Sequence, residues 1–190
     1  LDATNLNGEL IVSGTSTAAD VTIAGAQGKN DVTFNGAALK AAFIGQSAAD
    51  KVSFGTLAAT AAATAVTGAG NDTIIADATS LTGSLSVEAG AGDDVVELTA
   101  ASTTTGTVVL QFGEGTDTLK LANNADLTKA NLTITGLEKI KVDSDAMFNA
   151  DQLSGKTFVV EGTQANAADT ITAVGTASAD TINLSGLSMT

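Results

Sequence analysis

Six residue types are missing from this chain: cysteine, histidine, tryptophan, tyrosine, proline and arginine. Without cysteine there is no disulfide, and without cysteine and histidine there is no zinc site of the usual kind. The same absences remove the base of a Ser-His-Asp relay and the thiol nucleophile. The six phenylalanines offer few platforms for sugars, so the acidic pair Asp93-Asp94 is better explained by metal binding or solvation than by glycoside hydrolysis. We therefore expect no enzyme.

Positive charge is also scarce. The 190 residues carry 8 lysines against 21 acidic side chains, for a net charge of −13. We expect no nucleic-acid partner, because binding a polyphosphate needs a basic face. An acidic chain instead suits divalent cations, or simply solubility. No apolar run reaches the roughly 18 residues that a membrane span needs, and the nearest, residues 57–66, reads as either a strand or a helix.

One short phrase occurs three times in the middle of the chain. Residues 67–74 read TGAGNDTI, residues 89–96 read AGAGDDVV, and residues 112–119 read FGEGTDTL. Each fits G-x-G-x-D-x-U, where U is a large aliphatic residue, which is the centre of the nonapeptide repeat that binds Ca²⁺ in RTX proteins. The three aspartates, Asp72, Asp94 and Asp117, are 22 and 23 residues apart.

The residue types in this phrase suit calcium. Two glycines permit backbone angles at which carbonyl oxygens can turn toward one point, and aspartate adds the hard oxygen that Ca²⁺ prefers. We expect one ion between the first and second turns and another between the second and third. A metal-free turn is the alternative, since Gly and Asp are common in turns. The candidate ligand residues are Gly68, Gly70, Asn71, Asp72, Gly90, Gly92, Asp93, Asp94, Gly113, Gly115 and Asp117.

The repeat interval predicts the fold. Periods of 20–50 residues are typical of solenoids, and short strands between Gly turns favour an all-β, right-handed parallel β-helix or β-roll-like solenoid with coils of about 22 residues. The aliphatic residues of the alternating segments should point inward. They are Val12, Ile23, Ile74, Val87, Val96, Leu110, Leu119, Ile134, Ile140, Val159, Ile171 and Ile182.

A longer repeat begins near residues 1, 76 and 148. Each copy leads through Leu-x-Gly into an alternating apolar segment, as at Leu81-Thr82-Gly83. We therefore expect residues 1–190 to form a single solenoid domain. Both Leu1 and Thr190 fall inside repeat-like sequence, so this domain is expected to be a fragment of a longer chain.

Other aspartates precede aliphatic strands without the regular glycine pair. These turns are too long or too poor in glycine for carbonyls to converge readily, so we interpret them as structural turns in which Asp accepts from backbone amides, with calcium binding as the less favoured alternative. They end at Asp20, Asp31, Asp50, Asp169 and Asp180.

The Gly-x-Gly-x-Asp turns, the Leu-x-Gly-x-x-x-Val repeats and the segment TGLEKIKV at residues 135–142 together resemble bacterial S-layer proteins. The likeness is to the RTX-type, type I-secreted S-layer proteins of bacteria such as Caulobacter and Campylobacter. It covers nearly the whole chain in composition, but only the three turns are specific motifs. The chain departs from the family in lacking the first Gly of each motif and in its longer interval.

This resemblance implies a secreted, extracellular structural protein that assembles with copies of itself into a two-dimensional lattice when calcium is present. Cell-surface polysaccharide could be bound through regions outside residues 1–190. The alternative is a secreted adhesin or the calcium-binding RTX repeat domain of a toxin or exoenzyme. Lattice formation distinguishes the two, because an adhesin domain should stay monomeric.

Overall fold

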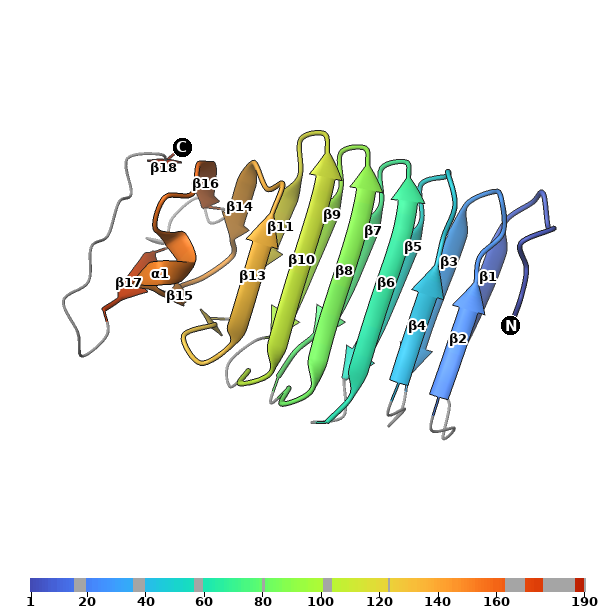
Figure 1. Cartoon of the computed structure of the whole chain (residues 1–190), viewed down its shortest axis with the longest axis horizontal. Coiled ribbons are helices and arrows are strands. Elements are labelled where there is room, and N and C mark those ends of the chain that lie inside the picture. The colour runs from blue at the N-terminus through green and yellow to red at the C-terminus, as the bar shows by residue number, and fades with distance from the viewer. Residues whose placement is uncertain are drawn as a thin grey trace.

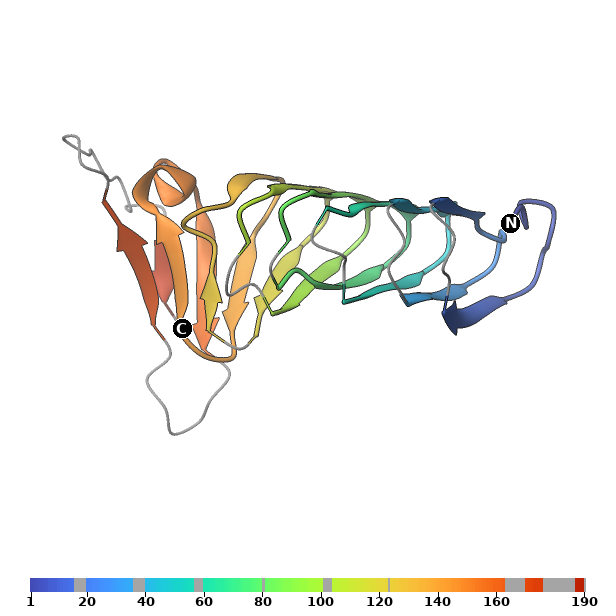
Figure 2. The ribbon, with the colours of Figure 1, turned by 90° about the horizontal axis from the view of Figure 1, so that it is seen from below.

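The computed structural model describes residues 1–15, 20–35, 40–56, 60–79, 81–100, 104–122, 124–162, 170–175 and 187–189. These residues form a β-solenoid whose flattened coils stack along one axis (Figures 1 and 2). The helix in this part of the chain is α1 (Ala150–Leu153). The predicted all-β fold is confirmed.

Three parallel sheets make up the solenoid. The nine-stranded sheet contains, in spatial order, β1 (Leu10–Thr15), β3 (Asn30–Asn35), β5 (Lys51–Thr56), β7 (Thr73–Asp77), β9 (Val95–Ala100), β11 (Thr118–Leu121), β14 (Lys139–Val142), β16 (Phe158–Gly162) and β18 (Leu187–Met189). The six-stranded sheet contains β2 (Asp20–Ala24), β4 (Lys40–Ile44), β6 (Ala62–Ala69), β8 (Ser84–Ala91), β10 (Thr107–Glu114) and β13 (Asn131–Thr135). The three-stranded sheet contains β12 (Ala125–Asp126), β15 (Ala146–Asn149) and β17 (Ile171–Val174).

From β1 to β14, each coil passes once through the six-stranded sheet and once through the nine-stranded sheet. In Figure 1 the chain runs up the front strands, over the top, and down the rear strands while it moves leftward, which makes the coil right-handed. The coils range from 20 residues, where Leu10 lies opposite Asn30, to 29, where Phe158 lies opposite Leu187. The predicted length of about 22 residues lies within this range.

Small polar and aliphatic residues alternate along the strands, and the aliphatic ones fill the interior. In β8, for example, Leu85 and Val87 are buried while Ser84 and Ser86 face outward. Such alternation is what a strand with one buried face requires. Residues 62–69 are strand β6, so the ambiguous segment 57–66 is extended at least from Ala62.

Most of the residues predicted to point inward do so. Ile23, Ile74, Val87, Val96, Leu110, Leu119 and Ile140 are buried, and Val12, Ile134 and Ile171 pack partly buried against the core. The prediction is wrong for Val159, which lies opposite Lys139 on the outward side, while Phe158 and Val160 point inward. The two valines are adjacent in an unbroken apolar run, so alternation alone cannot set their register. Ile182 lies outside the described residues.

The stacking changes toward the C-terminal end. The six-stranded sheet ends at β13, and the next coil places α1 and a loop where a further strand would otherwise lie (Figure 1). The Gln152 side chain fixes α1, because it donates to the carbonyl oxygens of Leu127 and Ala130 at 3.0 and 3.1 Å and accepts from the Asn149 amide at 2.8 Å. Within the described ranges, no helix combines the length and hydropathy of a membrane span.

Candidate functional site

A row of polar side chains runs through the solenoid at the turn that leads from the six-stranded to the nine-stranded sheet. Each member lies two residues before a buried aliphatic residue, as Asp72 does before Ile74. Coil stacking therefore brings these side chains into one line, which we call the carboxylate ladder. Its members are Asn30, Asp50, Asp72, Asp94, Asp117 and Glu138.

Hydrogen bonds connect each ladder member to the next coil. The Asp50 amide donates to Asp72 Oδ1 at 2.7 Å, the Asp72 amide to Asp94 Oδ1 at 2.8 Å, and the Asp94 amide to Asp117 Oδ1 at 2.8 Å. The Asp117 amide donates to Glu138 Oε2 at 2.9 Å, and the Asn30 amide to Asp50 Oδ1 at 2.8 Å. These bonds satisfy backbone amides that would otherwise be buried without a partner.

The second oxygen of each aspartate is the unusual feature. Asp50, Asp72, Asp94 and Asp117 are at most 2% exposed. In all four, Oδ2 is buried and has no hydrogen-bond partner; the Thr67 hydroxyl lies near Asp72 and favours its ionised form, but it donates to the Ala89 carbonyl oxygen at 2.9 Å. A buried ionised oxygen without a donor is costly. Bound protons or cations would therefore stabilise these four Oδ2 atoms.

Burial also shows in the acidity of these groups. Desolvation raises the pKa of Asp72 to about 6, from an ordinary value of 3.8. The pKa values of Asp50, Asp94 and Asp117 are raised in the same direction, and desolvation is again the largest cause. The neighbouring ladder carboxylates raise the pKa of Asp72 further, because like charges disfavour ionisation.

The predicted glycines adopt the backbone that the turns require. Gly68, Gly90 and Gly113 are register partners with φ of 98°, 108° and 114°. A Cβ atom on Gly90 would collide with the carbonyl group of Gly68, and one on Gly113 with that of Gly90. These carbonyls therefore point along the stack toward the next glycine. Gly70, Gly92 and Gly115 form a second such row, with φ of 122°, 139° and 138°.

Asn71 and Asp93 belong to a different row. Both side chains are exposed. Asn71 Oδ1 accepts from the Asp93 amide at 3.0 Å, and Asp93 Oδ1 accepts from the Thr116 amide at 2.8 Å. The structure thus places the eleven predicted site residues at one edge of the solenoid, but it separates Asn71 and Asp93 from the buried ladder.

Three ladder members, Asn30, Asp50 and Glu138, were not among the site residues predicted from the sequence. Asp50 was expected to accept from a backbone amide, and it does so, but it also shares the unpartnered oxygen of the other three aspartates. Asp31 was expected to have the same role, yet Asn30 occupies the ladder position and Asp31 faces outward, 3.9 Å from Lys51 Nζ. Glu138 ends the ladder.

A sequence signal for these missed members exists. Asp50, like Asp72, stands two residues before an aliphatic core residue, and the two aspartates are 22 residues apart. Of the remaining turns, Asp20 is exposed at the first residue of β2, and Asp169 and Asp180 lie outside the described residues.

The ladder meets part of what a calcium ion requires. It supplies one unpartnered carboxylate oxygen in each of four coils. Asp50 Oδ2 and the Thr67 carbonyl oxygen both pack closely against Gly45, where a Cβ would have no room. Within the described ranges, however, no three His, Cys, Asp or Glu side chains gather closely enough to hold a metal ion. A cation would therefore need backbone carbonyl oxygens as further ligands.

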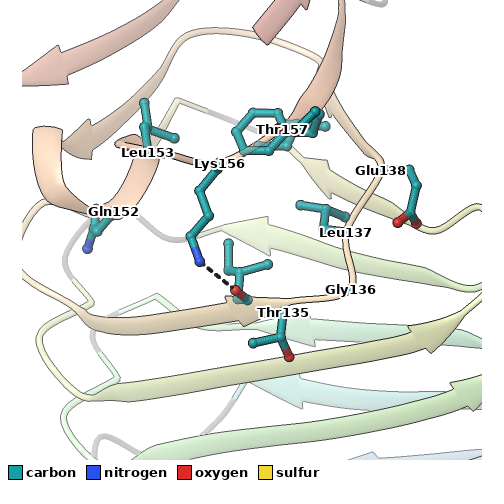
Figure 3. A pocket seen from close by; sticks show the side chains of 12 residues that line it. Thr135, Gly136, Leu137, Glu138, Gln152, Leu153, Lys156 and Thr157 are labelled. Carbon is teal, nitrogen blue, oxygen red and sulfur yellow. Dashed lines mark hydrogen bonds between the residues drawn. The ribbon is translucent and has the colours of Figure 1, made fainter. Parts of the chain in front are cut away.

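A separate pocket of about 350 Å³ lies where strand stacking ends, between β13 and the segment around α1 (Figure 3). Its walls include Ile134, Leu137, Leu153 and Phe158. Lys156 reaches across it and donates to the Ile134 carbonyl oxygen at 3.1 Å. Glu138 at its rim accepts from the Asp117 amide. Both charged lining side chains, Lys156 and Glu138, therefore form hydrogen bonds with the backbone of neighbouring coils.

No protein-family model, curated protein or solved structure matches this chain.

Proposed function

We propose that this chain is a structural segment of a bacterial surface layer, secreted to the cell surface, that assembles with copies of itself into a two-dimensional lattice in a calcium-dependent way. The observation that carries the proposal is the row of buried, unpartnered oxygens on Asp50, Asp72, Asp94 and Asp117. A divalent cation is the partner that such a row of hard oxygens favours.

Calcium would act on stability and on charge together. The ladder aspartates would supply carboxylate oxygens, and backbone carbonyls of the glycine turns would supply the others. Bound Ca²⁺ would compensate carboxylates that otherwise remain protonated or unfavourably ionised. It would also reduce the repulsion between chains that each carry a net charge of −13. Stacked coils with polar outward faces suit a load-bearing or spacing role rather than catalysis.

The test has two parts. Isothermal titration calorimetry on the metal-depleted chain should show calcium uptake, and Asp94→Ala should reduce it. Electron microscopy of the chain should show ordered sheets with calcium and dispersed particles with chelator.

Two outcomes would contradict the proposal in different ways. Absence of calcium uptake would remove the role of the ladder. Calcium uptake with monomers under both conditions would favour the secreted adhesin or the RTX repeat domain of a toxin or exoenzyme.

A further inference from the structure

The outward side of the six-stranded sheet differs in charge from the rest of the molecule. Its strands β2, β4, β6, β8, β10 and β13 present three rows of register partners, which begin with Asp20, Thr22 and Ala24. We call these three rows the low-charge face. Its central row consists of small or β-branched side chains, namely Thr22, Ala42, Thr64, Ser86, Val109 and Thr133.

Very little charge interrupts this face. Its charged side chains are Asp20, Lys40 and Glu88, all near its margins, so it carries a net charge of −1 on a chain of −13. Apolar side chains are also exposed on it, since Ile44 is 49% exposed and lies beside Val66 in the third row. In Figure 1 the face points toward the viewer, and no other described segment crosses it.

The outward side of the nine-stranded sheet carries more charged side chains. Lys51 lies 3.9 Å from Asp31, Lys120 lies 3.2 Å from Glu97, and Lys139 lies 2.8 Å from Glu161. Charged side chains there are arranged in cross-strand pairs and remain hydrated, as expected of a surface that stays in water. The two large faces of one solenoid thus have different surface chemistry.

We propose that the low-charge face is a contact surface for a second copy of this chain, packed face to face. Only three charged side chains lie in the three rows of this face, so packing two copies of it together removes few charges from water. Flat sheets with small side chains pack well against one another, and a self-complementary patch gives a two-fold contact. The inference rests on the proposed lattice function and names the surface by which neighbouring chains would meet.

The size of the face sets the strength of this contact. Six strands about 4.8 Å apart and five residues at about 3.3 Å each give a footprint of about 400 Å² per chain. Stable interfaces bury about 800 Å² per partner, so a single contact of this kind is weak. Repetition along a lattice multiplies weak contacts, which suits reversible assembly.

The primary test places a charge on either face. Thr64→Glu puts a carboxylate at the centre of the low-charge face, and Ser53→Glu puts one at a matched outward position of β5. Both variants are first checked for an unchanged circular dichroism spectrum. In sedimentation equilibrium with calcium, Thr64→Glu should weaken self-association by about tenfold or more, because like charges then face each other, while Ser53→Glu should change it less than about twofold. Equal effects of the two variants, or a parent chain that stays monomeric at the highest concentration measured, would overturn the inference.

Cysteine cross-linking gives a second measurement. Because the chain has no cysteine, Ser86→Cys introduces a single thiol on the face, and Ser53→Cys supplies the control. Disulfide-linked dimers should form under mild oxidation at least about tenfold faster for Ser86→Cys, reflecting a specific contact rather than random collision. Equal rates would contradict face-to-face packing.

Microscopy separates this inference from the proposed function. Sheets that form equally well with Thr64→Glu would refute the face as a lattice contact and leave the proposed function standing. Dimers that Thr64→Glu disrupts, in a chain that never forms sheets, would support the face and refute the lattice.

Discussion

The turns in the middle of the solenoid and the turns near its N-terminal end supply the same ladder through different backbones. The middle turns contain glycine pairs such as Gly90 and Gly92, whose φ angles are 108° and 139°. Positive φ is not found at Gly25 or Gly45, although the turns that follow them deliver Asn30 and Asp50 to the same row. The ladder therefore requires a side-chain acceptor at one position, and the glycine pair is one of two ways to place it.

The end of the ladder also differs chemically from its middle. Asn30 uses its whole amide group, accepting from the Ala26 amide at 2.7 Å and donating to Asp50 Oδ1 at 2.8 Å and to the Gly28 carbonyl at 3.0 Å. Asp94, in the middle, leaves one oxygen without a partner. An amide therefore completes its hydrogen bonds within the protein, whereas a carboxylate needs a proton or a cation from outside.

The largest expected effect comes from breaking a middle turn. Gly90→Ala should lower the free energy of unfolding by about 4 kcal/mol, because it adds an unfavourable positive φ to a collision with the Gly68 carbonyl. Gly155→Ala is the matched control, since Gly155 has φ of 71° but no atom within 4 Å of the new Cβ. Its cost should be about 1 kcal/mol. Urea denaturation measures both, and equal losses would contradict the close approach.

Titration of Asp72 gives the next largest effect of a single residue. The pKa of Asp72 is about 6 in the folded chain, against 3.8 ordinarily. The folded state therefore binds more protons than the unfolded state between these values, so stability should be greatest near pH 4 and fall as the pH rises through 6. The loss for Asp72 is on the order of 3 kcal/mol, and the raised pKa values of Asp50, Asp94 and Asp117 act in the same direction.

Urea denaturation with chelator at several pH values measures this dependence. Added calcium should restore stability at neutral pH by favouring the ionised form. Stability that rises with pH in chelator would contradict the assignment of these buried carboxylates.

The repeat interval and the alternation of residue types were enough to predict the coil and most of its buried residues. The interval between Asp72 and Asp94 predicted the coil, and the alternation in β8 predicted which residues lie inside. It could not predict that Asn30 rather than Asp31 joins the ladder, because the two are adjacent polar residues and only stacking on Asp50 chooses between them. The end of the six-stranded sheet at β13 was likewise hidden, since a four-residue helix leaves little periodic signal.

The smallest of the three effects tests the chemical contrast between Asn30 and Asp94. Asp94→Ala removes the acceptor for the Asp72 amide, and an unsatisfied buried N–H should cost about 2 kcal/mol in chelator at neutral pH. Asp94→Asn keeps an oxygen acceptor and removes the buried charge, so it should cost less than about 1 kcal/mol or stabilise the chain. Calcium should stabilise the parent chain more than either variant, because both lose the carboxylate. If Asp94→Asn costs as much stability as Asp94→Ala, the ladder depends on the negative charge rather than on the acceptor oxygen. An asparagine could then not replace an aspartate in the middle of the ladder, although Asn30 serves at its end.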